Sequence, residues 1–555
     1  MNSPLSSSNS TDKQTEGNAT SQDAPEWKAG KAEWTIIIVL AFVSLMVSID
    51  ATILVPALPS LAVALNGSAA DTFWTGTSYL LTQAIFQPFI VALSDAFGRR
   101  ILYCISLLFF TVGTLICCLA NNFIQLLAGR AIQGIGGGGL LSLGLVIMTD
   151  IVPLRQRPLY LVVNQMAWAV GTIVGPLLGG LFVEKTTWRW IFYVNFPFCG
   201  VELVAAPLAI KLHARRAPVK ERLLSTDWVG AVLFIGSTCS FLIGLTRGGT
   251  EYPWSSWKIL VPMVVGVVGT AATVVWEIYG APTPFLRLSV FNSPSAAFAY
   301  IGATFQGLLM FCKLYYIPFY FETAKDFGPI ITGVTLLPII LTMLPTSMIV
   351  GKLMTKSGRY RWAIWSGWAI TCLGTGLLIL LDNETKTYAW ILIFIVVGLG
   401  HGLIIMSLNI AIQAMAETQD VAYAAAMYLF LRTLGMSIGV AIGGAVFQNM
   451  LSKHLVEHSL PSSIAHDAEG FVAVLKTLVK DSAQYQSYVK AFSTSFQNVF
   501  QTLTGVAGSA ALLSLFIRNY SMDKDLNTEH MLRVRSLDRE QTITKDGFSS
   551  NGSKH

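Results

Sequence analysis

Two charged residues inside apolar runs are the first candidates for chemistry. Asp50 lies in the apolar run 35–58 and Arg130 in the run 123–149. Each residue is about seven or eight positions from the predicted outer end of its run, which places both roughly 10–12 Å deep at 1.5 Å per residue. A charge at that depth is costly and usually meets a partner or faces a cavity. A carboxyl group that alternates between paired and unpaired surroundings can bind and release a proton, so Asp50 is a candidate proton site.

A structural role is the alternative for both residues. Asp50 could be held by hydrogen bonds near Thr52 and the helix end, and Arg130 could brace two helices as a fixed guanidinium. Glu202 and His401 are further ionisable residues in apolar runs, and the sequence shows no partner for either. We add Glu202 to Asp50 and Arg130 as a third candidate for proton coupling.

A charged turn at residues 91–100 lies between two apolar runs, and a degraded copy recurs at residues 351–359. A repeated span-turn-span unit is typical of transporters built from two related halves. The Asp95 carboxylate could meet the positive end of a neighbouring helix, and Arg99 could pair with Asp150. The alternative is that these charges only set the topology. The gating candidates are Asp95, Gly98, Arg99, Arg100 and Asp150.

Small residues repeat at helical spacing in the run 159–183 and leave one face without side chains, which permits close helix contact and local bending. A packing and hinge role is expected for Gly171, Gly175, Pro176, Gly179 and Gly180.

Polar and aromatic residues in several other runs could line a substrate cavity. A cavity with aromatic walls and few hydrogen-bonding groups suits bulky amphipathic molecules better than sugars or phosphates. Packing is the alternative for each aromatic residue, and Lys313 could instead extend to the outer surface. The cavity candidates are Tyr79, Gln83, Gln133, Asn164, Trp168, Gln306 and Lys313.

Runs of about twenty apolar residues are long enough to cross a bilayer as helices. By this rule the sequence predicts fourteen spans, at residues 35–58, 73–93, 101–120, 123–149, 159–183, 189–211, 227–246, 258–277, 295–321, 330–351, 361–381, 387–413, 421–449 and 491–517.

Basic residues cluster in the turns that follow even-numbered spans, which predicts that these turns and both tails are cytoplasmic. Glycosylation sequons at Asn66 and Asn383 fall in turns on the outer side, so these two are the expected glycosylation sites. The sequons at Asn9, Asn18 and Asn551 lie in the tails and should stay unmodified.

Composition excludes several classes of protein. Only 12% of the 555 residues are charged and 53% are hydrophobic, which indicates a polytopic membrane protein. The net charge of +6 comes from turns and tails, so no nucleic acid is expected as a partner. The chain lacks a Walker sequence, a nucleophile-base set and metal-ligand spacing, so we expect neither ATP-driven transport nor an enzyme, and no cofactor or metal.

Four motifs together resemble those of the major facilitator superfamily. They are the charged turn, Asp50-Ala51-Thr52-Ile53, Arg130-Ala131-Ile132-Gln133-Gly134-Ile135-Gly136 and the glycine-proline run 171–180. The glycine-proline run looks like the motif typical of the family's antiporters. The Asp50 motif, the Trp-rich run 188–197 and the count of fourteen spans resemble its fourteen-span drug:proton antiporter branch, as in fungal toxin and multidrug efflux pumps. The charged turn departs from the family pattern, with Val91 in place of its glycine and Ala96 in place of its usual basic residue.

The resemblance implies an all-α membrane fold of two six-helix bundles plus two additional central helices, and a role for Arg130 in proton transfer. The expected organisation is a disordered cytoplasmic tail at 1–33, a first bundle at 34–211, the additional helices at 227–277, a second bundle at 295–517 with an external loop at 451–490, and a cytoplasmic tail at 518–555.

The function expected from these features is proton-coupled efflux of amphipathic small molecules, such as a drug, toxin or secondary metabolite, by alternating access. The expected partners are the substrate, protons and the lipid bilayer, for a monomer in the plasma membrane, with the vacuolar membrane as the alternative. The rival functions are a vacuolar carrier of basic amino acids, a siderophore exporter and a non-transporting receptor. The short tail after Arg518 disfavours the receptor.

Overall fold

The computed structural model describes residues 27–67, 69–212, 218–224, 226–249, 252–480 and 482–524. Within these residues the chain is built from helices and contains no β-strand. Most of both predicted tails, including the sequons at Asn9, Asn18 and Asn551, lies outside the described residues.

The first half of the chain contains the helices α1 (Lys31–Ile53), α2 (Leu58–Ala64), α3 (Ala69–Phe97), α4 (Arg99–Cys118), α5 (Phe123–Ile151), α6 (Arg157–Lys185), α7 (Trp190–Tyr193), α8 (Asn195–Ala209), α9 (Val219–Leu224), α10 (Trp228–Arg247) and α11 (Trp257–Tyr279), with the short 3-10 helix η1 (Val55–Ala57).

The second half contains α12 (Pro294–Ala324), α13 (Pro329–Thr335), α14 (Leu337–Ser357), α15 (Arg361–Leu377), α16 (Thr387–Met415), α17 (Val421–Glu457), α18 (Ala468–Leu475) and α19 (Ala483–Ser514), with the 3-10 helices η2 (Leu288–Phe291), η3 (Leu378–Leu380), η4 (Thr418–Asp420) and η5 (Ser462–Asp467).

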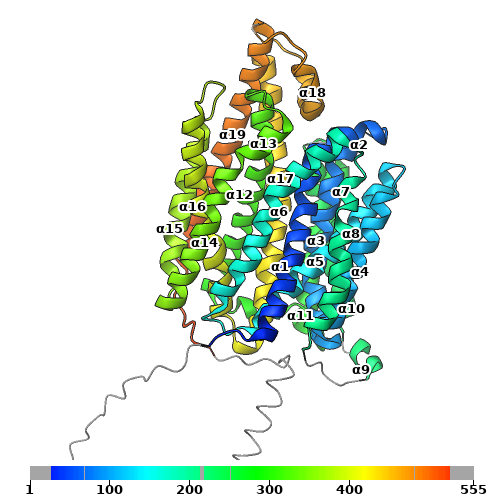
Figure 1. Cartoon of the computed structure of the whole chain (residues 1–555), viewed down its shortest axis with the longest axis vertical. Helices are drawn as coiled ribbons and strands as arrows, with labels where there is room; N and C mark the ends of the chain where they lie inside the picture. Colours follow the sequence, from blue (N-terminus) through cyan, green and yellow to red (C-terminus); the bar gives the residue numbers. More distant parts are fainter. Residues whose placement is uncertain are drawn as a thin grey trace, which may run out of the picture.

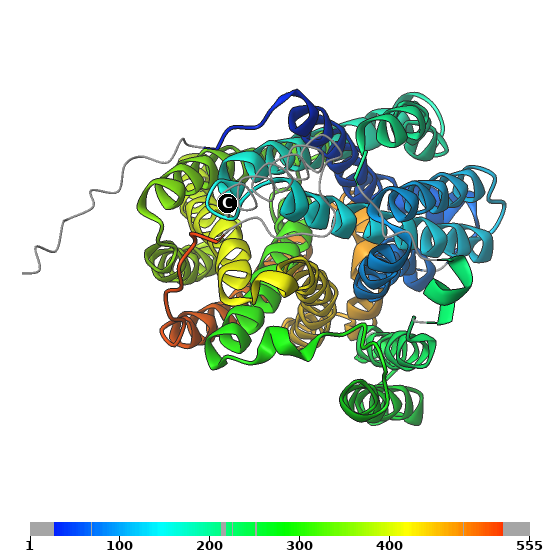
Figure 2. The same cartoon turned by 90° about the horizontal axis from the view of Figure 1, so that it is seen from below.

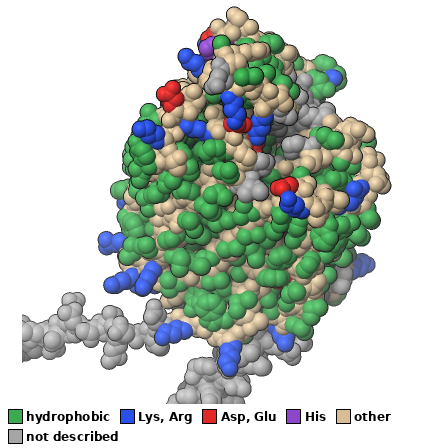
Figure 3. Space-filling view, turned by 45° about the horizontal axis from the view of Figure 1, so that its top comes forward, with side chains coloured by type: hydrophobic (Ala, Val, Ile, Leu, Met, Phe, Trp, Pro, Cys, Tyr) green, Lys and Arg blue, Asp and Glu red, His purple; other side chains and the backbone are tan. Residues whose placement is uncertain are grey.

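Among the described residues, thirteen helices are long and apolar enough to cross a membrane. They match the first thirteen predicted spans, and α19 takes the place of the fourteenth. It is 32 residues long, but its exposed residues include Gln484, Gln486, Lys490 and Gln501. Hydrophobic side chains cover the middle of the face shown in Figure 3, and most charged side chains lie towards its two ends. This distribution is the one that a bilayer requires.

The long helices form two bundles of six. The first bundle contains α1, α3, α4, α5, α6 and α8, and the second contains α12, α14, α15, α16, α17 and α19. The bundles stand side by side in Figures 1 and 2 and meet where α17 packs on α3 and α5, and where α14 packs on α6. We call the end where the chain enters α1 and leaves α19 the tail end, and the other the opposite end.

The two additional helices are central in the chain but lie on the outside of the molecule. α10 packs on α3 and α17, and α11 packs almost entirely on α10 (Figure 2). Val264, Val268 and Val275 of α11 are more than half exposed, as expected of a lipid-facing helix.

The predicted external loop at 451–490 is shorter in the structure. α17 continues to Glu457 and α19 begins at Ala483, so both ends of the predicted loop are helical. The segment between them contains η5 and α18. The polar residues that suggested a loop lie partly in this segment and partly in the ends of α17 and α19, which extend beyond the other long helices in Figure 1.

Close packing between α1 and α6 depends on the predicted small-residue face. A Cβ atom on Gly175 would lie 2.1 Å from the Thr52 hydroxyl oxygen, and one on Gly179 would lie 2.2 Å from the Ile53 carbonyl oxygen. Contacts this short cannot exist, so α1 fits against α6 only because these positions have no side chain.

Candidate functional site

Asp50 lies at the centre of a buried cluster of polar side chains. Its carboxylate accepts hydrogen bonds of 2.8 Å from Arg130 Nη1, from Gln133 Nε2 and from Asn195 Nδ2. The Asp50 and Arg130 side chains are each about 1% exposed, and Gln133 and Asn195 are fully buried. Asp50 and Arg130, predicted to lie at the same depth, therefore form a direct ion pair.

The guanidinium of Arg130 is fixed by further contacts. Its Nε donates to the Thr75 carbonyl oxygen over 3.2 Å, its Nη1 donates to Gln133 Oε1 over 2.7 Å, and it lies 4.2 Å above the centre of the Tyr79 ring. Gln133 also donates to the Thr114 hydroxyl over 2.9 Å. The cluster thus joins α1, α3, α4, α5 and α8. We call Asp50, Arg130, Gln133 and Asn195 the carboxylate cluster.

Thr52 does not hold Asp50, in contrast to one sequence-based alternative. Its hydroxyl donates to the Ser48 carbonyl oxygen over 2.8 Å. Sequence reasoning did not find Asn195 as a partner of Asp50, although it lies in the Trp-rich run 188–197. An Asn at the start of a helix is usually a local capping residue, and only the packing of α8 against α1 brings it to the carboxylate.

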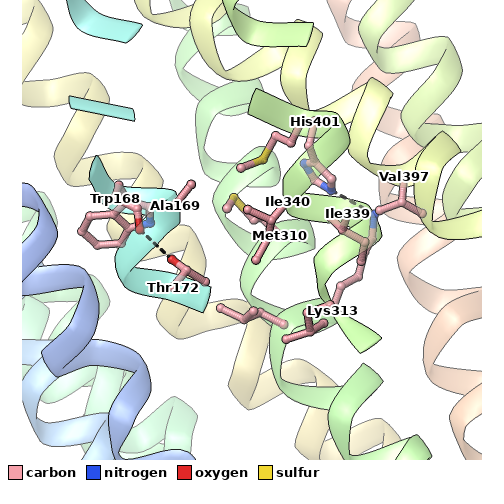
Figure 4. A pocket seen from close by; sticks show the side chains of 12 residues that line it. Trp168, Ala169, Thr172, Met310, Lys313, Ile339, Ile340, Val397 and His401 are labelled. Carbon is pink, nitrogen blue, oxygen red and sulfur yellow. Dashed lines mark hydrogen bonds between the residues drawn. The ribbon is translucent and has the colours of Figure 1, made fainter. Parts of the chain in front are cut away.

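A pocket lies between the bundles, near the middle of the long helices. It comprises about 530 Å³ of space not filled by protein atoms, part of which is open to solvent. One wall comes from α6 and the other from α12, α14 and α16 (Figure 4). The lining residues are Trp168, Ala169, Thr172, Met310, Lys313, Leu314, Leu336, Ile339, Ile340, Met343, Val397 and His401.

Two ionisable residues provide the polar part of this pocket. Lys313 Nζ donates to the Thr375 hydroxyl over 2.7 Å and lies 3.1 Å from His401 Nε2. Lys313 is 2% exposed, so it does not extend to the outer surface as one alternative proposed. His401 Nδ1 has no hydrogen-bond partner among the described residues.

A second cation, after Lys313, lies next to this pocket. Arg432 of α17 donates from Nε to Gln306 Oε1 over 2.8 Å, and its Nη2 lies 3.7 Å from the sulfur of Met310, which lines the pocket. Arg432 was not a sequence-based candidate, although its position within an apolar run, like that of Arg130, could have identified it.

The pocket and the carboxylate cluster are connected through α1. Ser48, two residues before Asp50, donates to the Trp168 carbonyl oxygen over 2.5 Å and lies 2.9 Å from the Thr172 hydroxyl. Trp168 and Thr172 both line the pocket. A displacement of α1 at Asp50 would therefore reach the pocket wall directly.

The other predicted cavity residues are divided between these sites. Trp168 and Lys313 line the pocket, Gln306 binds Arg432 beside it, and Gln133 and Tyr79 belong to the surroundings of Asp50. Gln83 and Asn164 do not line this pocket. Gln83 is buried on α3 and Asn164 is half-buried on α6. The side-chain amide oxygen of each has no hydrogen-bond partner among the described residues.

Glu202 is buried on α8 at 1% exposure, but it is not part of the carboxylate cluster. It follows Asn195 by two helical turns, and its Oε2 has no hydrogen-bond partner among the described residues.

The charged turn adopts the predicted pairing at the tail end. Arg99 is buried and forms ion pairs with Asp95 and, over 3.1 Å, with Asp150. Gly98 has φ +94°, which only glycine adopts without strain, and Gly358 in the repeated turn has φ +63°. Arg100 is exposed next to this pair.

Polar contacts among the described residues join the two bundles at the tail end. Arg155 Nε donates to the Thr355 carbonyl oxygen over 3.1 Å, and Arg157 Nη1 donates to Gln413 Oε1 over 2.7 Å. The Tyr423 side chain hydrogen-bonds to Asp95. We call these three contacts the tail-end latch.

The small residues of α6 serve the packing on α1 already described, and Gly171 lies there beside Ser48. Pro176 lies within α6, and its Cβ is 3.6 Å from the position of a Cβ on Gly333 of the second bundle. Gly180 follows Gly179 on the same helix. Asn66 is exposed in the turn between α2 and α3, and Asn383 is exposed in the turn between η3 and α16; both turns lie at the opposite end (Figure 1).

Comparison with known proteins identifies the family of this architecture. The sequence profile described as Major Facilitator Superfamily matches residues 40–440. The chain is 41% identical over 529 residues to MFS transporter L2 of a Phoma species, covering 93% of this chain and 88% of that protein. It is 31% identical over 543 residues to Efflux pump FUS6 of Gibberella moniliformis, covering 96% of each chain.

Among solved structures, the human organic anion transporter MFSD10 (TETRAN) superposes with a TM-score of 0.56 at 15% sequence identity. The match covers 88% of this chain and 100% of that one. At this identity the likeness concerns the fold alone.

Proposed function

Because this chain belongs to the major facilitator superfamily, we propose that it exports amphipathic small molecules in exchange for protons, by alternating access of a central pocket to the two sides of the membrane. The family and its relatives are membrane transporters, among them one named as an efflux pump, and not enzymes. The proton coupling, the alternating access and the roles of individual residues are the proposed part.

The observation that carries the proposal is the carboxylate cluster. An Asp–Arg pair with about 1% exposure is costly to bury, and replacing such a pair with apolar residues is often neutral or stabilising. A charged pair buried at membrane depth is by default a candidate functional site. Asp50 would exchange the proton, while Arg130 keeps its charge at every accessible pH.

Protonation of Asp50 would weaken the cluster. The neutral carboxyl group can no longer form charge-assisted hydrogen bonds with Arg130, and its new O–H needs an acceptor where Gln133 and Asn195 now donate. The helices that these residues tie to α1 would then be held less tightly. Glu202 is the second candidate proton site, because it is buried on the same helix as Asn195.

The connection from α1 to the pocket would carry this change to the substrate. Ser48 binds both Trp168 and Thr172, and the close fit between α1 and α6 leaves no space for one helix to move without the other. Interfaces packed this closely shift between discrete arrangements rather than deform continuously. Proton binding at Asp50 and substrate binding near Trp168 would therefore favour different arrangements.

The tail-end latch would belong to one of these arrangements. If the tail end is cytoplasmic, as the charge pattern predicts, these contacts close the pocket to the cytoplasm and favour a form that opens outward. Asp95, Gly98, Arg99, Arg100 and Asp150 would set the strength of this closure, and Pro176 with the glycines of α6 would permit the bending.

The lining of the pocket favours an amphipathic substrate. Its walls are mainly Leu, Ile, Met and Val side chains with Trp168, and its charged groups are few. A carrier of basic amino acids would require acidic groups, and no Asp or Glu is among the lining residues. This rival is therefore disfavoured.

The test uses proteoliposomes with a fluorescent amphipathic substrate and an imposed pH gradient. Wild-type protein should concentrate the substrate against its gradient. Asp50→Asn should still equilibrate the substrate down its gradient but should not concentrate it, because it mimics the protonated carboxyl group. If the variant concentrates substrate as well as the wild type does, Asp50 is structural. Downhill flux in the same vesicles shows that the variant is folded.

A further inference from the structure

The second bundle buries two cations without an acidic partner. Lys313 is 2% exposed and Arg432 is 8% exposed, both near the middle of long helices. Their hydrogen-bond partners are the neutral groups of Thr375, His401 and Gln306. No ion pair joins either cation to a carboxylate in the part of the chain that the structure describes.

In the first bundle, Arg99 and Arg157 are buried near the tail end, and the buried cation within the membrane, Arg130, has an acidic partner. Arg130 pairs with Asp50 at 2.8 Å, and these residues belong to the first and fourth long helices of their bundle. Lys313 and His401 occupy the first and fourth long helices of the second bundle, α12 and α16, and lie 3.1 Å apart. The two pairs join corresponding helices of the two bundles, but the second pair lacks the carboxylate.

Lys313 and His401 together keep hydrogen-bond donors that a ligand could use. Thr375 and His401 accept two of the three ammonium hydrogens of Lys313, so the third remains. When His401 Nε2 accepts, the ring proton is on Nδ1, which is buried and has no partner among the described residues. Met310 lies in the pocket wall and contacts the Arg432 guanidinium. A ligand group that only accepts hydrogen bonds and carries negative charge would match this set.

We propose that the pocket binds organic acids, with the anionic group of the substrate beside Lys313 and His401 and its apolar body against Trp168 and the aliphatic wall of α14. This rests on the proposed function in one respect, that the pocket is the substrate site. The anionic group of the substrate would take the place beside Lys313 that the Asp50 carboxylate has beside Arg130. Arg432, behind Met310, adds to the positive field.

The apolar part of the pocket supports the same orientation. Figure 4 shows Trp168 and Thr172 across the pocket from the contact between Lys313 and His401. The apolar lining also includes Leu336, Ile340 and Met343. An amphipathic acid lying across this space would place its charged end at α12 and α16 and its apolar end at α6 and α14.

The test compares dansyl-phenylalanine with its methyl ester, which has the same apolar groups but no charge. Binding to the purified full-length protein in detergent is measured by dansyl fluorescence and by thermal stabilisation. The wild type should bind the carboxylate about tenfold or more tightly than the ester, the usual effect of a charge-assisted contact. Lys313→Met should reduce this ratio to about one, mainly by weakening the carboxylate.

Trp168→Leu is the matched control, because it changes the apolar wall and leaves the cations in place. It should weaken both ligands by a similar factor and keep the preference for the carboxylate. Without ligand, Lys313→Met should melt at the wild-type temperature or above it, because it removes an uncompensated buried charge.

Three results would overturn the proposal. They are equal binding of the two ligands by the wild type, no stabilisation of the wild type by the carboxylate, and a large drop in the melting temperature of Lys313→Met, which would make Lys313 structural. Binding in detergent requires no proton gradient. A failed uphill-export test with intact carboxylate preference therefore refutes proton coupling alone, and the reverse pattern refutes only the organic-acid site.

Discussion

The ion pair between Asp50 and Arg130 allows a quantitative prediction about stability. Removing one partner of a buried pair typically costs about 3–5 kcal/mol of unfolding free energy, because a charge remains buried without a partner. Asp50→Asn leaves the Arg130 guanidinium in that position, and the guanidinium cannot lose its proton. We expect a loss of about 3–5 kcal/mol for this variant.

Arg130→Met should cost less than Asp50→Asn. It leaves the Asp50 carboxylate with its donors Gln133 and Asn195, each at 2.8 Å, and a carboxylate can also be neutralised by a proton. The double variant Asp50→Asn/Arg130→Met removes both charges and should be more stable than Asp50→Asn alone. The expected coupling energy is about 2–3 kcal/mol, within the range for residues in one network.

The assay is denaturant or thermal unfolding of the four proteins in the same mixed micelles, followed by intrinsic Trp fluorescence. The pair of Glu184 and Lys185 is the control, because its atoms are also 2.8 Å apart but its side chains are 56% and 64% exposed. Lys185→Ala should change the stability by at most about 1 kcal/mol. Additive effects of Asp50→Asn and Arg130→Met would refute the view that the two residues act as a buried pair.

Three further predictions concern other parts of the molecule. Gly175→Ala, whose Cβ would lie 2.1 Å from the Thr52 hydroxyl, should lower the free energy of unfolding by about 1–3 kcal/mol or more. Gly200→Ala, whose Cβ would have no atom within 4 Å, is the control and should be neutral or stabilising. Equal melting temperatures of the two variants would contradict the close packing of α1 on α6. Tyr423→Phe removes one hydrogen bond of the tail-end latch, worth about 0.5–1.5 kcal/mol. The ratio of open to closed molecules, measured from spin-label distances across the tail end, should therefore rise about two- to tenfold. An unchanged distance distribution would exclude Tyr423 from gating. If the protein passes through the secretory pathway, replacing Asn66 and Asn383 by Gln should together abolish the gel shift seen on glycosidase treatment, and a shift that survives would contradict the topology.

Most of the fold could be predicted because a bilayer imposes a simple rule on the sequence. Each span must present about twenty apolar residues, and the long helices start and end near the predicted limits. The prediction was less accurate where helices leave the bilayer. α17 and α19 extend into the segment predicted as a loop, because outside the membrane a helix no longer needs apolar residues.

The pairing of Asp50 with Arg130 could also be predicted, because the position of a residue within its apolar run gives its depth in the membrane. The partners Asn195 and Gln133 could not, since their positions around the carboxylate depend on how α8 and α5 rotate against α1. The same limit applied to Lys313. Its depth follows from its position in the apolar run, but only the packing of α16 on α12 and of α15 on α16 shows that it meets His401 and Thr375 rather than the outer surface.

The most direct test of the central claim is substrate-driven proton movement. Proteoliposomes contain a pH-sensitive dye and no imposed pH gradient, and an inward or outward gradient of an amphipathic substrate is applied. If Asp50 couples the two fluxes, substrate flow through the wild type must drive protons in the opposite direction, and Asp50→Asn must carry substrate without a change in internal pH. Substrate flow through the wild type without any proton movement, or equal proton movement in Asp50→Asn, would contradict the account.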